Sequence, residues 1–283
     1  MMGLAYWEKA WENARARSPV APGNTDGAGW LSYWDYVAEQ YAGPGEEEDP
    51  SDSEIIEYLR REGVFRPGDR VLDIGCGAGA YALQFAREAR SVLGIDPSKY
   101  MLSKLMAAAG RLPEGSVSAQ MTRWEDFDPG DRYDLVFTAF CPGVHNPETL
   151  WKMEACSGRS CCYIAGDRSH FRLLDQLWAE LFGEPGSCDV YDVAYPLNLL
   201  YSAGRKPNLR FFRSESGWLA PSEQLVEEYT LYFDALAKTG PSKREAIKRF
   251  IEARTVDGCV EMCQSYIVCV LHWDIPDVDA SHV

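Results

Sequence analysis

The stretch that decides the fold is RVLDIGCGAGAY, residues 70–81. Its apolar start, VLDI, follows a Pro-Gly-Asp breaker and predicts the first buried strand of a parallel sheet. The chain then turns through three alternating glycines, Gly75, Gly77 and Gly79, and the stretch YALQFAREAR (81–90) predicts a helix. Glycines let the backbone turn tightly and leave bare N–H groups at the start of a helix. This geometry suits a ligand that carries an adenosine or an anionic group.

The position of the acid in this turn discriminates between nucleotide-binding patterns. A dinucleotide site has G-x-G-x-x-G with an acid about twenty residues later, and a P-loop ends in Gly-Lys-Ser/Thr. Here the acid, Asp73, precedes the first glycine, and the glycines alternate. The pattern therefore disfavours both a nicotinamide dinucleotide and a P-loop nucleotide.

The sequence around the turn resembles the first motif of the class I S-adenosyl-L-methionine (SAM)-dependent methyltransferases, and the resemblance covers roughly residues 52–170. It implies an α/β fold with a seven-stranded, mostly parallel Rossmann-like sheet flanked by helices. It also implies SAM as cofactor and S-adenosyl-L-homocysteine (SAH) as product. By resemblance, the acid and the turn hold the amino-acid end of SAM, a role that we assign to Asp73, Gly75, Cys76, Gly77 and Gly79. The alternative is a strand-to-helix turn without a ligand.

The second predicted strand, SVLGID (91–96), ends in Asp96-Pro97. A carboxylate here accepts hydrogen bonds from both ribose hydroxyls, and it lies seventeen residues after Gly79, the spacing that the resemblance implies. We assign Asp96 and Pro97 to the cofactor, and we expect Met101 to pack on the adenine or ribose. The alternative for Asp96 is an acidic turn at the end of a strand.

Further cofactor contacts are expected after the third and fourth strands, predicted over 116–121 and 133–140. By resemblance, a carboxylate after the third strand accepts the exocyclic amine of adenine while an apolar side chain flanks the ring. Trp124 and Glu125 fit these roles, with Asp126 as an alternative carboxylate. A helix N-terminal turn is the structural alternative. Phe140, which ends the fourth strand, is also assigned to the cofactor.

Two histidines are candidate general bases, because an imidazole with a pKa near 6.5 suits proton removal. His145 lies in CPGVHN (141–146), where the resemblance places residues that face the transferred methyl group and the substrate. His170 follows the fifth predicted strand, 160–167. The alternative for His145 is a loop histidine with local hydrogen bonds. A thiolate or carboxylate acceptor needs no base at all.

The N-terminal segment predicts two helices, over 1–18 and 30–42. By resemblance, the YWD…Y segment of the second helix folds over SAM or the substrate as a lid. We assign substrate contacts to Tyr33 and Trp34, and a cofactor contact to Tyr41. The alternative is a helix pair that is packed on the surface.

The organisation that follows is an N-terminal helical cap, 1–50, and a SAM-binding domain, 51–283. Helical patterns within about 171–204 and 221–255 predict two insertions, the second of them before the last strand of the sheet. The sixth and seventh strands are predicted over 208–214 and 260–273. A chain of 283 residues is long enough to bury a sizeable core.

Composition limits the partners and the compartment. A net charge of −15 disfavours a phosphate-backbone partner, and no run approaches the ~20 apolar residues that span a bilayer. The start of the chain lacks the pattern of a secretory signal. Nine cysteines, an odd number without a C-x-x-C pair, fit reduced thiols in the cytoplasm. The few histidines show no metal-ligand spacing, so no metal is expected.

The aromatic residues of the lid and the bulk of the two insertions favour an enclosed pocket, and therefore a small-molecule methyl acceptor. One alternative is a protein or tRNA methyltransferase, which would use a basic patch such as Arg205, Lys206, Arg210 and Arg213. Another is a SAM-binding protein that transfers nothing. The sequence leaves the acceptor atom and the oligomeric state open.

Overall fold

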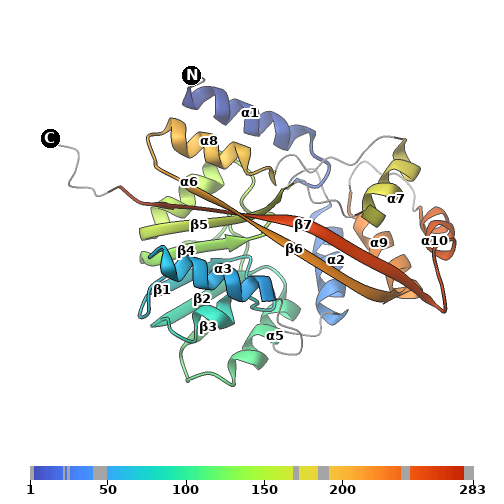
Figure 1. Cartoon of the computed structure of the whole chain (residues 1–283), viewed down its shortest axis with the longest axis horizontal. Coiled ribbons are helices and arrows are strands. Elements are labelled where there is room, and N and C mark those ends of the chain that lie inside the picture. Colours follow the sequence, from blue (N-terminus) through green and yellow to red (C-terminus); the bar gives the residue numbers. More distant parts are fainter. Residues whose placement is uncertain are drawn as a thin grey trace.

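The computed structural model describes residues 3–21, 23, 26–40, 50–167, 172–183, 191–236 and 243–276. It is an α/β structure with helices on both faces of one twisted sheet (Figure 1). The predicted fold class is therefore confirmed for the sheet and its flanking helices. None of the described helices is long and apolar enough to cross a membrane.

The sheet contains seven strands in the order β3-β2-β1-β4-β5-β7-β6. All neighbours from β3 to β5 are parallel, whereas β7 pairs antiparallel with both β5 and β6. Because the glycine turn follows β1 at the centre of the sheet, it lies between the ends of β2 and β4. The strands are β1 (Arg70–Ile74), β2 (Ser91–Asp96), β3 (Val117–Met121), β4 (Tyr133–Ala139), β5 (Ser157–Asp167), β6 (Asn208–Pro221) and β7 (Cys259–Asp274).

Two apolar clusters cover the faces of the sheet. One face packs against α3 (Pro50–Arg61), α4 (Ala82–Phe85) and α5 (Lys99–Ala109), through buried side chains that include Leu59, Phe85 and Leu105. The other face packs against α6 (Pro147–Cys156) and α8 (Ala194–Ser202), over which α1 (Leu4–Arg17) lies. The first predicted helix therefore packs on α8 and α6, where the ring of Trp11 stacks on Tyr195.

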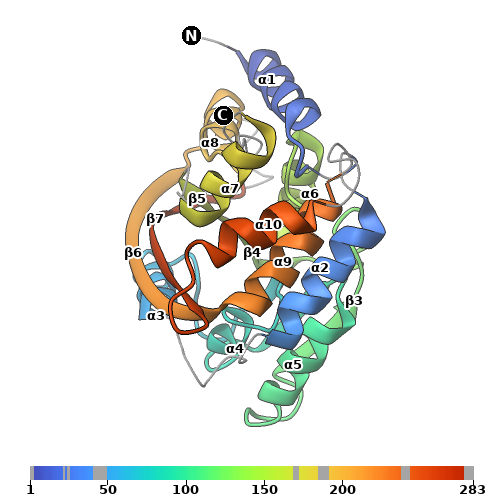
Figure 2. The ribbon, with the colours of Figure 1, turned by 90° about the vertical axis from the view of Figure 1, so that its right-hand side faces the viewer.

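A third apolar cluster lies beyond one end of the sheet. It joins α7 (Arg172–Phe182), α9 (Ser222–Asp234) and α10 (Arg244–Glu252), with α2 (Gly27–Gln40) packed along α9. Figure 2 shows α2, α9 and α10 side by side across this end of the sheet. The helices before the last strand are thus arranged as a cap over the sheet, and the proposed domain boundary at residue 50 stays a prediction.

The sixth strand is longer than predicted. It was expected to end at 214, but β6 continues to Pro221, which pairs with Cys259 of β7. Pairing of β7 with β5 ends at Ile267, so the remaining part of β6 and β7 forms a two-stranded arm that carries α9 and α10. The pairing with β7 overrides the turn-like sequence SESG at 214–217.

The helix after the glycine turn is shorter than predicted. It was expected over 81–90, but α4 ends at Phe85. The backbone after α4 bonds to the loop before β1: Arg90 N–H donates to Asp69 O at 2.9 Å, and Gly68 N–H donates to Glu88 O at 2.8 Å. Tertiary hydrogen bonds therefore replace the helical ones.

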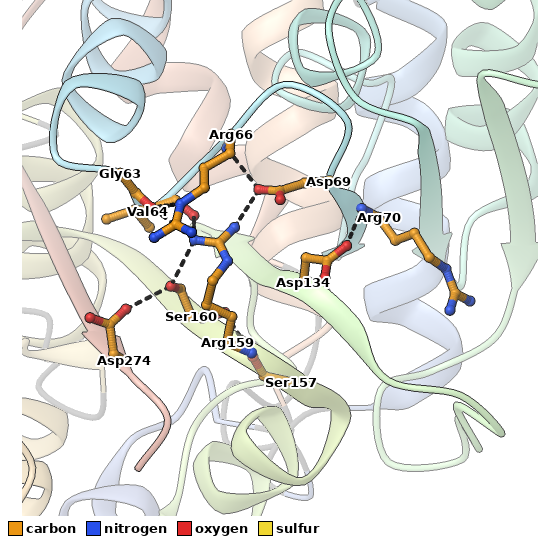
Figure 3. Close-up of polar contacts among 10 residues, drawn as sticks. All are labelled: Gly63, Val64, Arg66, Asp69, Arg70, Asp134, Ser157, Arg159, Ser160 and Asp274. Carbon is orange, nitrogen blue, oxygen red and sulfur yellow. Dashed lines mark hydrogen bonds and ion pairs between the residues drawn. The ribbon is translucent and has the colours of Figure 1, made fainter. Parts of the chain in front are cut away.

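A polar network joins the chain segments at the amino ends of the parallel strands, opposite the glycine turn (Figure 3). The Arg159 guanidinium donates to Asp69, to Gly63 O at 2.8 Å and to Val64 O at 3.1 Å. Asp69 also accepts from Arg66 N–H at 2.7 Å. The network joins the start of β5 to the loop that leads into β1, and it holds the central strand in register with its neighbours.

Replacement of Arg159 by methionine is expected to lower the free energy of unfolding by about 3 kcal/mol, because it leaves the Asp69 carboxylate buried without its cation. Urea denaturation measures the change. The matched control is Arg61→Met, since the Arg61 side chain is 71% exposed and its loss should cost about 0.5 kcal/mol or less. Equal losses in the two variants would contradict the structural role of the network.

Candidate functional site

The turn after β1 requires glycine for two reasons. Gly75, Gly77 and Gly79 all have positive φ, at 68°, 51° and 97°, a region that other residues enter at a cost. At Gly75 an added Cβ would also lie 2.7 Å from the Cβ of Cys141. The turn is therefore packed against the end of β4 on one side.

Asp96 bonds directly to this turn. One of its carboxylate oxygens accepts from Gly77 N–H at 3.1 Å, and the other accepts from Ser98 N–H at 2.8 Å. Burial raises the pKa of Asp96, and these two N–H groups oppose the rise. The ends of β1 and β2 are thus joined through one carboxylate, next to the exposed Pro97.

Helix α2 is fixed to the same place. The Ser98 hydroxyl donates to the Asp35 carboxylate at 2.6 Å and also caps α5 by accepting from Met101 N–H. Ala38 of α2 packs in a buried cluster with Ala78 of the turn and Met101 of α5. The structure therefore brings the glycine turn, Asp96 and Met101 together under α2.

Asp73 lies at the end of β1 and is only 2% exposed. Its carboxylate accepts from Ala82 N–H, and no lysine or arginine of the described residues forms an ion pair with it. Burial, and next the charge of Asp96, raise its pKa to about 8. Cys76 is also buried, with its Sγ toward Gly94.

The exit of β4 forms another side of the site. Phe140 has a φ of 51° and is 49% exposed, a strained conformation that is common at functional sites. Next to it, Cys141 accepts from Gly143 N–H at 3.3 Å through its sulfur, and burial raises the pKa of its thiol to about 12. Sequence reasoning did not single out Cys141, although its place directly after β4 could have indicated it.

His145 lies beneath this loop. It is 2% exposed, and its Nδ1 lies 3.1 Å from both Pro142 O and Gly143 O. Carbonyl oxygens only accept, so we assign the proton of the neutral ring to Nδ1. Burial lowers the pKa of His145, which keeps the ring neutral at pH 7. These are the local hydrogen bonds of the alternative interpretation of this residue.

Of the residues expected at the adenine, one is buried and two are exposed. Trp124 is 3% exposed, lies in the cluster on the α6 face and donates from its indole N–H to Thr149 O at 3.0 Å. Glu125 and Asp126, which follow it in a turn, are exposed. The two aromatic substrate candidates, Tyr33 and Trp34, lie on α2. Tyr41 and His170 lie outside the described residues.

Comparison with known proteins shows that the central segment is similar to methyltransferases. A sequence model of the methyltransferase domain matches residues 71–156. Over 71 residues the chain is 41% identical to a ubiquinone biosynthesis O-methyltransferase of Bradyrhizobium sp., an alignment that covers 24% of this chain and 27% of that protein. An uncharacterized protein of Haemophilus influenzae is 26% identical over 197 residues, 67% of this chain and 70% of the relative. The chain thus spans about a quarter of the curated methyltransferase that it matches.

Solved structures share the fold at low identity. The YcgJ protein of Bacillus subtilis superposes with a TM-score of 0.54 at 14% identity, over 80% of this chain and 98% of that one. Magnesium protoporphyrin IX methyltransferase of Synechocystis, solved with bound SAH, gives 0.51 at 14% identity, over 81% and 83%. The chain therefore contains a segment, residues 71–156, that matches the methyltransferase domain, and it shares its fold with these solved structures.

Proposed function

We propose that this chain binds SAM at the glycine turn and transfers its methyl group to a small-molecule acceptor. The observation that carries the proposal is the Asp96 carboxylate, which bonds to Gly77 N–H at the joined ends of β1 and β2. A carboxylate so placed has further lone pairs for ribose hydroxyls. The turn beside it offers a surface for the amino-acid end of the cofactor.

The residues fit such a cofactor. An added Cβ at Gly77 would meet only the Met101 sulfur within 4 Å, at 3.9 Å, so there is room beside the turn. Asp73 places a buried carboxylate there and Asp96 a half-buried one, and burial raises the pKa of each. The sulfonium and ammonium groups of SAM are the cations that such a pair favours.

SAM, when bound, supplies a methyl group on a positively charged sulfur. The contribution of the chain is to align the acceptor with this group and to exclude water. Helix α2 lies over the turn and carries Tyr33 and Trp34, which we propose as acceptor contacts. We propose Phe140 and Cys141, which follow β4, as further contacts of the bound cofactor.

A general base stays a prediction. We retain His145 because its neutral ring leaves Nε2 as an acceptor for a proton. Its burial means that an acceptor reaches Nε2 only if the loop from Cys141 to His145 rearranges. His170, outside the described residues, is the other candidate.

The four basic residues that a macromolecular acceptor would use are spread along the first half of β6 and the loop before it, with Arg213 opposite Ile267 of β7. Arg205 makes a bidentate pair with Glu154, at 2.9 and 2.8 Å. Arg205 and Lys206 precede β6, at the edge of the sheet opposite the glycine turn, and Arg210 lies over the ring of Phe212. Their positions favour a small acceptor over a protein or tRNA.

The cysteines support the cytoplasm as the proposed location. Cys161 and Cys162, adjacent in β5, are fully buried thiols. Cys76, Cys141 and Cys156 are likewise thiols outside any disulfide, as in proteins of reducing compartments.

Replacement of Asp73 by asparagine is expected to change the pH dependence of stability. Because its folded pKa, about 8, exceeds the unfolded value of 3.8, protonation of Asp73 contributes its full stability below pH 3.8, where both states are protonated, and progressively less above that pH. This contribution is lost as the pH rises toward 8, by about 1.4 kcal/mol per pH unit at most. Urea denaturation from pH 6.5 to 8 should show a falling free energy of unfolding in the wild type and a flatter profile in the variant.

The control for that experiment is Asp128→Asn, since Asp128 is exposed. Its profile should follow that of the wild type. Parallel profiles for wild type and Asp73→Asn would show that Asp73 is ionised in the ligand-free fold.

Replacement of Asp96 by asparagine is expected to weaken SAM and SAH binding at least about tenfold, because a charge-assisted hydrogen bond to the ribose is lost. Calorimetric titration with SAM, SAH and NADH measures the affinities, and Asp128→Asn again serves as the control. Binding of NADH alone would refute the cofactor assignment.

Incubation of the protein with methyl-labelled SAM is expected to label the low-mass fraction of a cell extract. Helix α2 packs over the glycine turn, and a site that it encloses would favour acceptors of that size. The protein and tRNA fractions, separated from the same incubation, should stay unlabelled. Label confined to either of these would support the macromolecular alternative, and SAM binding without any label would support a silent SAM-binding protein.

A further inference from the structure

Glu228 lies at the middle of the contact between α2 and α9. One end of this contact is marked by Asp26 N–H, which donates to Ala235 O at 2.8 Å. The other end is marked by the Tyr36 hydroxyl, which donates to Gln224 O at 3.3 Å. Glu228 is four residues before Tyr232, whose ring contacts Tyr33 of α2, so it lies on the face of α9 that packs against α2. Figure 2 shows the two helices side by side.

The Glu228 carboxylate has no ion-pair or hydrogen-bond partner within the described ranges. It is partly buried, and burial raises its pKa. The neighbouring acid on the same helix, Glu227, is by contrast paired with Arg244 at 2.7 Å near the surface. An unpaired carboxylate in such a place destabilises the fold unless a cation accompanies it.

Phenol rings of both helices lie near this position. Tyr232, one helical turn after Glu228 on α9, has its ring centroid 5.5 Å from that of the half-buried Tyr33 on α2. Burial raises the pKa of Tyr33 and Tyr36 of α2 and of Tyr229 of α9, and the charge of Glu228 adds to the rise at each of them.

Aromatic rings connect this position to the glycine turn. The ring centroid of Tyr33 lies 5.1 Å from that of Trp34 and 5.5 Å from that of Tyr232. Trp34 in turn packs against the buried cluster that contains Ala78 of the turn. The faces of such rings attract cations, most strongly where water is excluded.

We propose that the methyl acceptor carries a cationic group, an ammonium or quaternary ammonium, which the Glu228 carboxylate and the rings of Tyr33 and Trp34 hold beside the cofactor. The carboxylate provides the opposite charge, and the rings provide a surface that binds a cation without a hydrogen-bond donor. This inference rests on the proposed function, because it names the acceptor class of the same site.

The test compares ammonium ligands with neutral counterparts of the same shape. The pairs are choline with 3,3-dimethyl-1-butanol, and 2-phenylethylamine with 2-phenylethanol. Calorimetry on the full-length protein saturated with SAH gives the affinity for each compound. The variant is Glu228→Gln, which keeps the size of the side chain and removes its charge, and the control is Glu223→Gln, at an exposed position of α9.

In the wild type and in Glu223→Gln, the ammonium member of at least one pair should bind at least ten times more tightly than its neutral counterpart. In Glu228→Gln the difference should fall to threefold or less, while SAH affinity stays unchanged in all three proteins. No preference in the wild type, or a preference that survives in Glu228→Gln, overturns the inference. Failure of SAH to bind the wild type would instead refute the proposed function.

Discussion

The hydrogen bond from Gly77 N–H to the Asp96 carboxylate is the contact on which the site depends. It joins the turn after β1 to the end of β2, and the second oxygen of the same carboxylate accepts from Ser98 N–H at the start of α5. Ser98 then bonds to Asp35 of α2. Two strands, a turn and two helices are thus held around one half-buried carboxylate, whose charge a cation or further donors can balance.

In the rest of the fold, helices cover the carboxyl ends of the parallel strands. Parallel pairing from β3 to β5 brings the strand ends together, and the long antiparallel arm of β6 and β7 carries α9 and α10 over them. At the opposite, amino ends of the strands, Arg159 forms an ion pair with Asp69 (Figure 3). The stabilising Arg159–Asp69 pair and the candidate ligand site therefore lie at opposite ends of the strands. In open α/β sheets, ligands bind outside the carboxyl ends of the strands.

The sequence predicted the central sheet well because its signals are local: apolar runs such as VLDI and SVLGID, bounded by breakers. The length of β6 was not predictable in this way, since its polar segment is a strand only through pairing with β7. The early end of α4 likewise depends on hydrogen bonds to the distant loop before β1. Local sequence propensity gives no information about either the strand pairing or these hydrogen bonds.

The residues of the candidate site also divide into those that local sequence predicts and those whose position depends on tertiary packing. Asp73 and Asp96 lie at the ends of β1 and β2, and Gly77 follows β1. Their sequence motif and its spacing therefore indicated that they lie near one another. The orientation of Trp124 depends instead on its hydrogen bond to Thr149 of α6, and the place of Glu228 depends on how α9 packs against α2. Neither relation leaves a signal in the spacing of residues along the chain.

Amide hydrogen exchange with and without SAH tests most directly the claim that the ligand binds where Gly77 meets Asp96. We predict slower exchange over residues 75–81 and 96–101 and in α2 when SAH is present, with no change at the Arg159 network. Protection confined to residues 63–70 and 157–160, or unchanged exchange at the glycine turn under saturating SAH, would contradict it.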